Sequence, residues 1–343
     1  MDRSAMIFGI SGQDGLLLAD FLLKNNYRLI GFGRPSSISR NPHLAKLDGR
    51  IHICNGDLTN SDSVKAAIEQ HPVAEIYNLA AQSRPVISWQ LAVETGEVNA
   101  IGAHRLFEIV RRLRPETRIY QASSSDMFGD VRQSPQDEKT PLNPINPYAV
   151  AKTYAHHMAR VYRKTFGSYI SCGIMFNHES RYRDLRYLSQ KVTYGAACAK
   201  LGVTDSPDKN EEGEPIVRNA QLSLGNLDVV RDWGFAGDYI QAMWLMLQQH
   251  KADDFVIGTG EKRTIREMCK TAYEIVGADW QKHVISDPRF LRPFETGTTV
   301  ADATKARDAL GWKPTTSFKQ MLIDMIDAHI ERLQIIMSDS SVS

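Results

Sequence analysis

The chain lacks the features that mark several large classes of protein. Its four cysteines, Cys54, Cys172, Cys198 and Cys269, form no CxxC pair, so we expect buried thiols, no disulfide framework and no metal site. No apolar run is long enough to span a membrane, and the first residues lack a signal-peptide core. The formal net charge is only +1, which gives no indication of nucleic acid or a membrane as partner. These absences favour a cytoplasmic enzyme.

What the chain has is the composition of a globular protein, with 343 residues of which 42% are hydrophobic and 24% charged. Short apolar runs alternate with amphipathic stretches in the first half. This alternation predicts an α/β fold with a Rossmann-type, doubly wound parallel sheet. The expected strands are 5–8, 28–32, 51–55, 75–79, 118–122, 169–175 and 255–258, and the expected helices include 16–25, 61–71, 97–112, 147–166, 238–249 and 317–336.

A glycine-rich turn lies between the first expected strand and the first expected helix. It reads Gly9-Ile10-Ser11-Gly12-Gln13-Asp14-Gly15. Such a turn suits a dinucleotide pyrophosphate held at a helix N-terminus, with Gly9, Ser11, Gly12, Gln13, Asp14 and Gly15 as the contacts. Alone it is weak support for a function.

Tyr148 and Lys152 stand four residues apart, on one face of the expected helix 147–166. Beside an oxidised nicotinamide, the lysine is expected to lower the tyrosine pKa by favouring the phenolate. A phenolate next to a hydride acceptor is what an alcohol oxidation needs. The YxxxK spacing occurs by chance on many helices, but after the glycine turn it predicts a short-chain dehydrogenase/reductase.

The alternation breaks after residue 176 and returns over about 231–260. We expect residues 1–176 plus about 231–260 to form the cofactor-binding Rossmann domain. Residues of about 177–230 plus 261–335 would form a smaller, discontinuous α/β domain for the substrate. Residues 203–220 are polar and acidic, which is typical of a long exposed loop, and residues 338–343 are expected to be a disordered tail.

Several further segments carry a family resemblance. They are 9–15 (GISGQDG), 77–83 (YNLAAQS), 121–123 (QAS) with 127–129 (MFG), 148–152 (YAVAK), 176–180 (FNHES), 231–238 (RDWGFAGD), Arg292-Pro293 with Glu295, and 311–314 (GWKP). The chain resembles the GDP-mannose 4,6-dehydratases, extended short-chain dehydrogenases that act on nucleotide sugars. The NHES and RDWGFAGDY segments are specific to this branch of the superfamily.

The resemblance implies a three-step reaction on the sugar. The tyrosine matching Tyr148 takes the proton of the 4-hydroxyl while hydride goes to NADP⁺. A carboxylate then removes the C5 proton, water leaves from C6, and hydride returns to C6. By position the carboxylate is Asp126 and its hydroxyl companion is Ser124, with Lys152 beside Tyr148.

The family usually has Thr and Glu at these two positions. Aspartate retracts the carboxylate by one methylene, and a shift of about 1 Å can cost roughly 100-fold in rate. Either the sugar lies closer here or the elimination is weakened. The alternative is that Asp126 only caps a turn.

The loop after the second strand bears on the choice of cofactor. NAD-preferring sites usually place an acidic residue there, whereas this chain has Arg34, Ser36 and Ser37, which suit the 2′-phosphate of NADP. The resemblance adds cofactor contacts from Asp57, Leu58, Leu79, Ala80, Ala81 and His178, and a structural histidine is the alternative for His178. In family tetramers this loop reaches a neighbouring subunit, and here it is shorter, so we expect a homodimer or homotetramer.

For the nucleotide diphosphate sugar, the resemblance implicates Ser83, Asn177, Lys191, Arg231, Arg292 and Glu295. Two or three cations fit a diphosphate, although Lys191 and Arg292 are also explained by ordinary surface solvation. The expected function is NADP-dependent dehydration of a GDP-sugar, by default GDP-mannose.

Three alternative functions remain at this stage. The first is dehydration of another nucleotide sugar, such as GDP-heptose. The second is a nucleotide-sugar 4-oxidase or epimerase, which Asp126 would separate from a dehydratase. The third is a non-catalytic NADP-binding protein, against which the presence of both Tyr148 and Lys152 argues.

Overall fold

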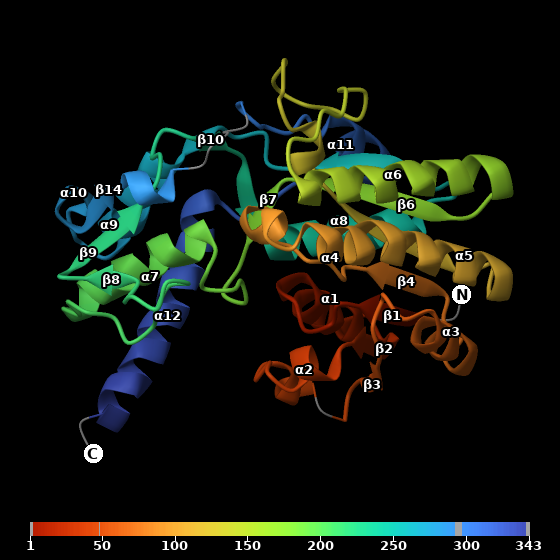
Figure 1. The fold of residues 1–343 in the computed structure, drawn as a ribbon, viewed down its shortest axis with the longest axis horizontal. Helices are drawn as coiled ribbons and strands as arrows, with labels where there is room; N and C mark the ends of the chain where they lie inside the picture. The colour runs from red at the N-terminus through yellow and green to blue at the C-terminus, as the bar shows by residue number, and fades with distance from the viewer. Residues whose placement is uncertain (1–2, 48, 292–296, 341–343) are drawn as a thin grey trace.

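The fold is built around a seven-stranded sheet in which every neighbouring pair of strands is parallel (Figure 1). The computed structural model describes residues 3–47, 49–291 and 297–340. The strand order β12-β6-β5-β4-β1-β2-β3 reverses its winding between β1 and β4, so the predicted doubly wound sheet is confirmed. The strands are β1 (Ser4–Phe8), β2 (Arg28–Gly33), β3 (His52–Asn55), β4 (Glu75–Asn78), β5 (Arg118–Ser124), β6 (Ile170–Met175) and β12 (Asp254–Ile257).

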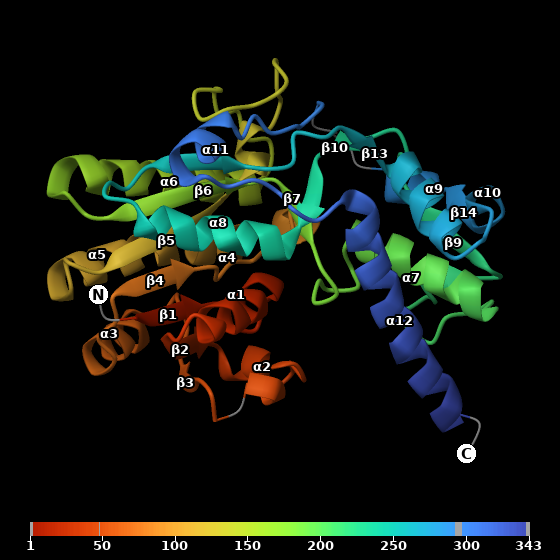
Figure 2. The ribbon, with the colours of Figure 1, turned by 180° about the vertical axis from the view of Figure 1, so that it is seen from behind.

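Helices cover both faces of this sheet, as Figures 1 and 2 show from opposite sides. One face carries α1 (Gln13–Lys24), α8 (Ala236–Gln248) and α11 (Thr304–Leu310), and the other carries α3 (Ser61–Gln70), α5 (Ala103–Leu113) and α6 (Pro147–Phe166). The central strand β1 is apolar on both sides for this reason: Ala5 and Ile7 enter one core, and Met6 and Phe8 enter the other.

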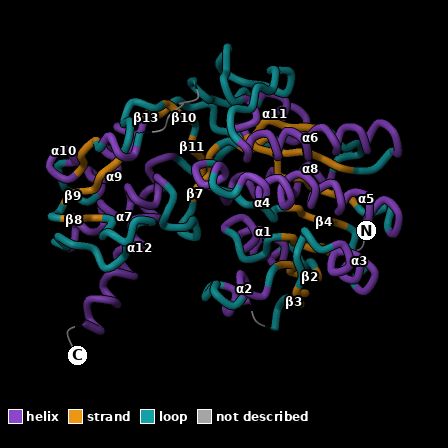
Figure 3. Tube along the Cα trace, in the orientation of Figure 1, coloured by secondary structure: helices purple, strands orange, loops and turns teal. Residues whose placement is uncertain are grey.

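A second, smaller unit lies beside the sheet and mixes short strands with helices (Figure 3). Its apolar core draws on the helices α7 (Leu188–Leu201), α9 (Ile265–Ile275) and α12 (Phe318–Ser340). They pack with a small sheet of order β14-β9-β8, formed by Val284–Ser286, Gln221–Leu224 and Val217–Arg218. Two further strand pairs are β7 (Asn177–Glu179) with β11 (Trp233–Phe235), and β10 (Val230–Arg231) with β13 (Arg263–Thr264).

Three local features differ from the sequence-based expectations. The expected substrate span 261–335 includes residues 303–312, yet α11 and Trp312 pack in the sheet core, where the Trp312 indole donates to the Asp238 carbonyl. Residues 203–220 include β8, and Ile216 and Val217 are buried there. Of the expected disordered tail 338–343, residues 338–340 belong to helix α12, and residues 341–343 lie outside the described residues.

The helix expected at 97–112 begins earlier, as α4 (Ala92–Gly96), and passes through a π-helical turn at Glu97–Gly102 into α5. Two shorter helices are α2 (Pro35–Ile38) and α10 (Trp280–His283). Among the described helices, none is both long and apolar enough to cross a lipid bilayer.

Asp232 joins three separate segments between the two units. Its carboxylate is fully buried and accepts four hydrogen bonds, from Thr259 N (2.9 Å), Thr259 Oγ1 (2.6 Å), Gly260 N (2.8 Å) and Ala301 N (3.1 Å). Burial raises the pKa of Asp232, and these donors work against that rise. The position of the RDWGF segment therefore depends on one carboxylate.

We expect Asp232→Ala to lower the free energy of unfolding by about 3 kcal/mol, because four donors lose their acceptor in a buried place. Asp228→Ala is the matched control, since Asp228 forms an exposed ion pair with Arg266 and its loss should lower the free energy of unfolding far less. Urea denaturation measures both changes. Equal losses in the two variants would contradict this account.

Candidate functional site

The predicted cofactor and catalytic residues collect at the carboxyl edge of the parallel sheet. In open α/β sheets ligands bind at this edge, where the winding reverses. The reversal here lies between β1 and β4. The residues that follow each strand are 9–15 after β1, Arg34, Ser36 and Ser37 after β2, Asp57 and Leu58 after β3, 79–83 after β4, Ser124 and Asp126 at the end of β5, and Asn177 and His178 after β6.

The glycine turn after β1 leaves no room for a side chain at Gly9 or Gly15. Gly9 has a φ of +84°, and a Cβ there would lie 2.8 Å from the backbone nitrogen of Ala80. A Cβ at Gly15 would lie 2.5 Å from the carbonyl oxygen of Gly9. Gly12 precedes α1 and has no side chain with which to cap the first amides of the helix. The N-terminus of α1 is thus suited to an anion such as a pyrophosphate.

The side chains after β2 and β3 are mostly accessible. Arg34 and Ser36 are exposed and Ser37 is half-buried at the start of α2, with the Arg34 guanidinium 4.0 Å from Glu94. The Asp57 carboxylate accepts hydrogen bonds from Thr59 N (2.8 Å) and Thr59 Oγ1 (2.7 Å). Leu58 is buried in the core, so only its backbone is available to a ligand.

Tyr148 lies in the first turn of α6, and local sequence fixes where that helix begins. The Asn146 side chain accepts a hydrogen bond from Ala149 N (2.8 Å), and Pro147 occupies the first helical position. Lys152, one turn on, donates from Nζ to the Ala122 carbonyl (2.9 Å) and lies 5.7 Å from the centre of the Tyr148 ring. Both side chains are buried.

The protein's own groups do not lower the pKa of Tyr148 in the expected way. Burial raises the Tyr148 pKa, the Asp126 carboxylate raises it further, and a hydrogen bond with Ser124 only partly offsets this. Lys152 is directed to the Ala122 carbonyl instead. Burial lowers the pKa of Lys152 to about 8, while the Asp14 carboxylate favours its charged form, so the ammonium still predominates at neutral pH.

Ser124 and Asp126 lie on either side of the start of a short 3-10 helix, Ser125–Phe128. The Ser124 hydroxyl caps this turn by accepting a hydrogen bond from Asp126 N at 3.2 Å. The capping side chain is therefore Ser124, and the Asp126 carboxylate is close enough to Tyr148 to act on its pKa. Ser124, Asp126 and Tyr148 form one cluster.

An ion pair between Asp14 and His178 connects the glycine turn with the NHES segment. The imidazole Nε2 of His178 lies 3.0 Å from Asp14 Oδ2, and its Nδ1 lies 2.7 Å from the Phe176 carbonyl oxygen. The His178 ring also stacks on Tyr239. Burial disfavours the charged form of both residues, but the charge and hydrogen bond of the partner favour it more strongly. The pKa of Asp14 therefore falls to about 2, and the pKa of His178 rises. His178 thus holds the turn that carries the cofactor candidates.

Two site residues escaped the sequence analysis. Arg183 stacks over the Tyr187 ring at 3.8 Å, lies 3.4 Å from Glu179, and exerts a charge effect on both Asp14 and Tyr148. The Tyr187 hydroxyl lies 2.8 Å from Ser83 Oγ, which places the predicted substrate residue Ser83 next to this cluster. The only sequence signal was an arginine shortly after the NHES segment.

The remaining substrate candidates are spread over the second unit. Lys191 is half-buried on α7, and Asn177 is half-buried on β7. Arg231, on β10, donates to the carbonyls of Val230 (2.7 Å) and Gly297 (3.4 Å). Arg292 and Glu295 lie outside the described residues.

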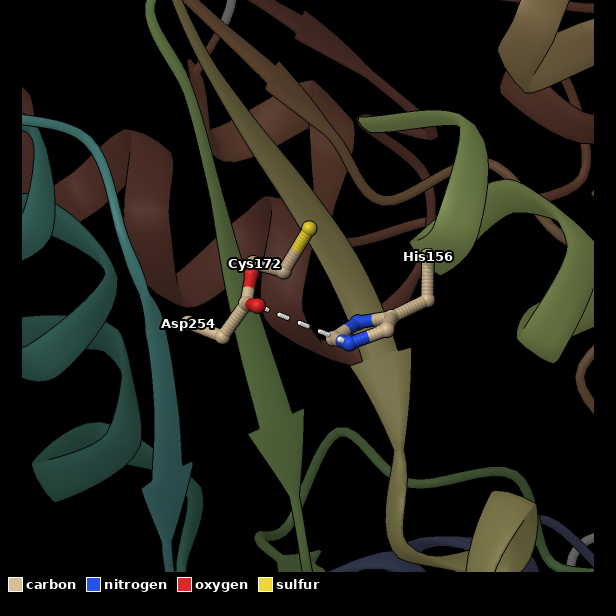
Figure 4. Close-up of side chains that lie close together, drawn as sticks. All are labelled: His156, Cys172 and Asp254. Atoms are coloured by element: carbon tan, nitrogen blue, oxygen red, sulfur yellow. Dashed lines mark ion pairs between the residues drawn. The ribbon is translucent and has the colours of Figure 1, made fainter. Parts of the chain in front are cut away.

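A cluster of potential metal ligands lies deeper in the sheet. His156 of α6, Cys172 of β6 and Asp254 of β12 come together, with the His156 imidazole 3.7 Å from the Asp254 carboxylate (Figure 4). The carboxylate is already paired with Arg163 Nη2 at 2.7 Å. Burial lowers the pKa of His156 to about 4 and raises that of the Cys172 thiol, which keeps the thiol protonated. This is the chemistry of a buried ion-pair network, because a metal needs a thiolate and an unneutralised carboxylate.

Comparison with known proteins decides the family. The family described as GDP-mannose 4,6 dehydratase matches residues 6–325 of this chain. The chain belongs to this family. GDP-mannose 4,6 dehydratase 1 of Arabidopsis thaliana is 39% identical over 96% of this chain and 90% of that protein. The human GDP-mannose 4,6 dehydratase is 36% identical over 96% of this chain and 92% of that protein.

Solved structures share the fold at lower identity. The dTDP-glucose 4,6-dehydratase of Bacillus anthracis, in complex with NAD, has a TM-score of 0.81 and 20% identity over 97% of this chain and 98% of that one. RMD from Pseudomonas aeruginosa, complexed with NADPH, has a TM-score of 0.79 and 21% identity over 96% of this chain and 99% of that one. The Rossmann-type architecture predicted from sequence is thus shared with both of these solved structures.

The Asp14–His178 pair gives stability a defined pH dependence. Because folding raises the pKa of His178, the histidine contributes fully to the free energy of unfolding below about pH 6.5. This contribution is lost as the pH rises through the pKa of His178 in the folded protein. Because folding lowers the pKa of Asp14, the aspartate contributes fully to the free energy of unfolding above about pH 4. This contribution is lost as the pH falls towards about 2. We expect His178→Gln to lower the free energy of unfolding more at pH 5 than at pH 9. Denaturant unfolding tests this, with exposed His250→Gln as control; an equal loss at both pH values would count against the pair.

Proposed function

We propose that this protein is an NADP-dependent GDP-sugar 4,6-dehydratase, with GDP-mannose as its default substrate. The observation that carries the proposal is the cluster of Ser124, Asp126 and Tyr148 in a member of this family. Tyr148 and Lys152 alone would serve a 4-oxidase or an epimerase equally well. A carboxylate beside Tyr148 is the additional group that an elimination requires.

The cofactor is proposed to lie across the carboxyl edge of the sheet. The amides at the start of α1 would hold the pyrophosphate, and the exposed Arg34 with Ser36 and Ser37 would hold the 2′-phosphate. Asp57, Leu58 and 79–81 would line the adenine and nicotinamide portions. When bound, the nicotinamide supplies a hydride acceptor that later returns the hydride to the sugar.

In the proposed reaction two bases act on one sugar. Tyr148 Oη takes the proton of the 4-hydroxyl, with Ser124 orienting the phenol and Lys152 adding positive charge nearby. The resulting 4-ketone makes the C5 hydrogen acidic. Asp126 removes that proton and passes it to the departing 6-hydroxyl, which leaves as water. When the hydride returns to C6, C5 would take up a proton from solvent, which completes the 4-keto-6-deoxy sugar. Lys191, Arg231 and Asn177 are proposed to bind the nucleotide diphosphate.

An exposed apolar surface supports a homodimer as the smallest assembly, and a homotetramer would contain the same contact. Apolar side chains stand in solvent on the segment 86–101 and on α6, which pack against each other (Figure 1). Val93 is 80% exposed, Trp89 65% and Val150 54%. An apolar surface of this kind marks a protein interface. We propose that a second copy of this chain covers it.

The dehydration is tested by mass spectrometry of GDP-mannose incubated with the enzyme, where loss of one water from the nucleotide sugar is the expected result. Asp126→Asn should reduce this loss by about 100-fold or more, since it removes the proposed base. It should still bind the nucleotide sugar. Exposed Asp130→Asn is the matched control. In heavy water, deuterium should enter C5 only with an intact Asp126. Near-normal dehydration by Asp126→Asn would assign the base elsewhere.

The cofactor preference is tested by fluorescence titration with NADPH and NADH. We expect tighter binding of NADPH, and Arg34→Ala should narrow the difference by about 1–3 kcal/mol because a charge-assisted contact is lost. Arg40→Ala, another exposed arginine nearby in the chain, should leave the difference unchanged. Equal affinities in the unmodified protein would refute NADP specificity.

A further inference from the structure

The connection 203–220 brings two carboxylates to the cations next to the proposed substrate residues. Glu211 forms an ion pair with Arg84, which directly follows Ser83 at the edge of the large sheet. Glu212 exerts a charge effect on Lys191 of α7. The acidic segment therefore bridges the two units at the side of the site where a nucleotide diphosphate is proposed to bind.

Arg84 and Lys191 are both partly buried cations, and we call these two residues the cation pair. The Arg84 side chain is only 15% exposed, and burial lowers the pKa of both groups. Neighbouring charges act on both residues. The Arg186 guanidinium disfavours the charge on Arg84 and Asp184 favours it, while Arg84 disfavours the charge on Lys191 and Glu212 favours it. Partly buried cations that repel one another are stabilised by an anion of more than one charge, and a diphosphate supplies one.

This cation pair is continuous with the catalytic cluster. Ser83, the neighbour of Arg84, contacts the Tyr187 hydroxyl at 2.8 Å. The Tyr187 ring lies under Arg183, and both Arg183 and Tyr187 exert charge effects on Tyr148. Contacts thus lead from Arg84 through Ser83 and Tyr187 to Arg183, and the charges of Tyr187 and Arg183 act on Tyr148.

The tip of the acidic segment is a self-contained turn. The Asn210 side chain accepts hydrogen bonds from Glu212 N (3.1 Å) and Glu214 N (2.9 Å), and Asn210 N donates to the Glu214 carbonyl (2.7 Å). Glu214 faces the other way, towards Arg218 (3.9 Å) and Arg289 (3.8 Å). The turn can thus keep its own shape when Glu211 releases Arg84.

We infer that Arg84 joins Lys191 in binding the substrate diphosphate, and that Glu211 competes with that diphosphate for Arg84. The inference rests on the proposed function, which supplies the nucleotide-diphosphate ligand. A ligand with two phosphates displaces the Glu211 carboxylate, because it brings more charge to the same cations. A ligand with no phosphate leaves the Arg84–Glu211 pair intact. The acidic segment 203–220 thus favours binding of ligands that carry a diphosphate over ligands that lack one.

The test is titration calorimetry of the full chain with GDP. Glu211→Gln removes the competing charge and should tighten GDP binding by about fivefold, the scale of a partly exposed ion pair. Glu214→Gln is the matched control, because it lies in the same turn and pairs on the opposite side; its GDP affinity should equal that of the unmodified protein. Damage to the fold does not tighten binding, so a gain in Glu211→Gln identifies competition.

A second variant tests the cation. Arg84→Gln should weaken GDP binding by about tenfold, and adding Glu211→Gln to it should bring no further change, because the carboxylate has lost its partner. Guanosine, which has no phosphate, should bind equally to the unmodified protein and to all four variants. Unchanged or weaker GDP binding in Glu211→Gln, or unchanged binding in Arg84→Gln, would overturn the inference.

The same series with UDP separates this inference from the proposed function. Parallel changes with GDP and UDP, together with no dehydration of GDP-mannose, would refute the function and support the role of Arg84. Dehydration of GDP-mannose together with GDP affinities that do not differ between the variants would support the function and refute the role of Arg84.

Discussion

The arrangement of the site depends on how closely the turn after β1 approaches the chain after β4. Gly9 touches the backbone of Ala80, and Gly15 touches the carbonyl of Gly9, at distances that exclude any Cβ. Because of these two contacts, α1 begins directly below the point where the sheet reverses its winding. The amides of α1, the residues after β4 and the end of β5 then share one edge. Larger residues at either glycine would push these parts away from one another.

Asp14, in the same turn, connects the parts of the site through its charge. It sits in the first turn of α1, pairs with His178, and favours the ammonium form of Lys152. Arg183 completes the set by favouring the Asp14 carboxylate. The turn proposed for the pyrophosphate and the helix that carries Tyr148 therefore share one electrostatic network, and the NHES segment is the part of the second unit that enters it.

The sequence predicts the parts of the molecule that follow local rules. The strands of the large sheet and α6 are found from apolar patterning. Arg183, Tyr187 and Arg84 were not found, because their roles come from contacts between segments about 100 residues apart, such as Ser83 with Tyr187. The packing of Trp312 in the core of the large sheet was missed for the same reason, since only the folded chain brings it to Asp238. Family resemblance supplied Ser124 and Asp126, which no spacing rule indicates.

The two proposed bases oppose each other, and this sets an order for the reaction. The Asp126 carboxylate must be ionised to remove the C5 proton, yet its charge raises the pKa of Tyr148 and disfavours the phenolate that oxidation needs. Once Tyr148 has taken the 4-hydroxyl proton it is neutral, and the repulsion ends. The carboxylate then acts beside an uncharged phenol, at the moment when the 4-ketone has made C5 acidic. Oxidation therefore favours the elimination in two ways: it makes the C5 hydrogen of the substrate acidic, and it leaves Tyr148 uncharged beside Asp126. The length of the aspartate side chain affects both steps. The position of its carboxylate sets the repulsion between Asp126 and the Tyr148 phenolate, and it also sets the distance from the carboxylate to C5.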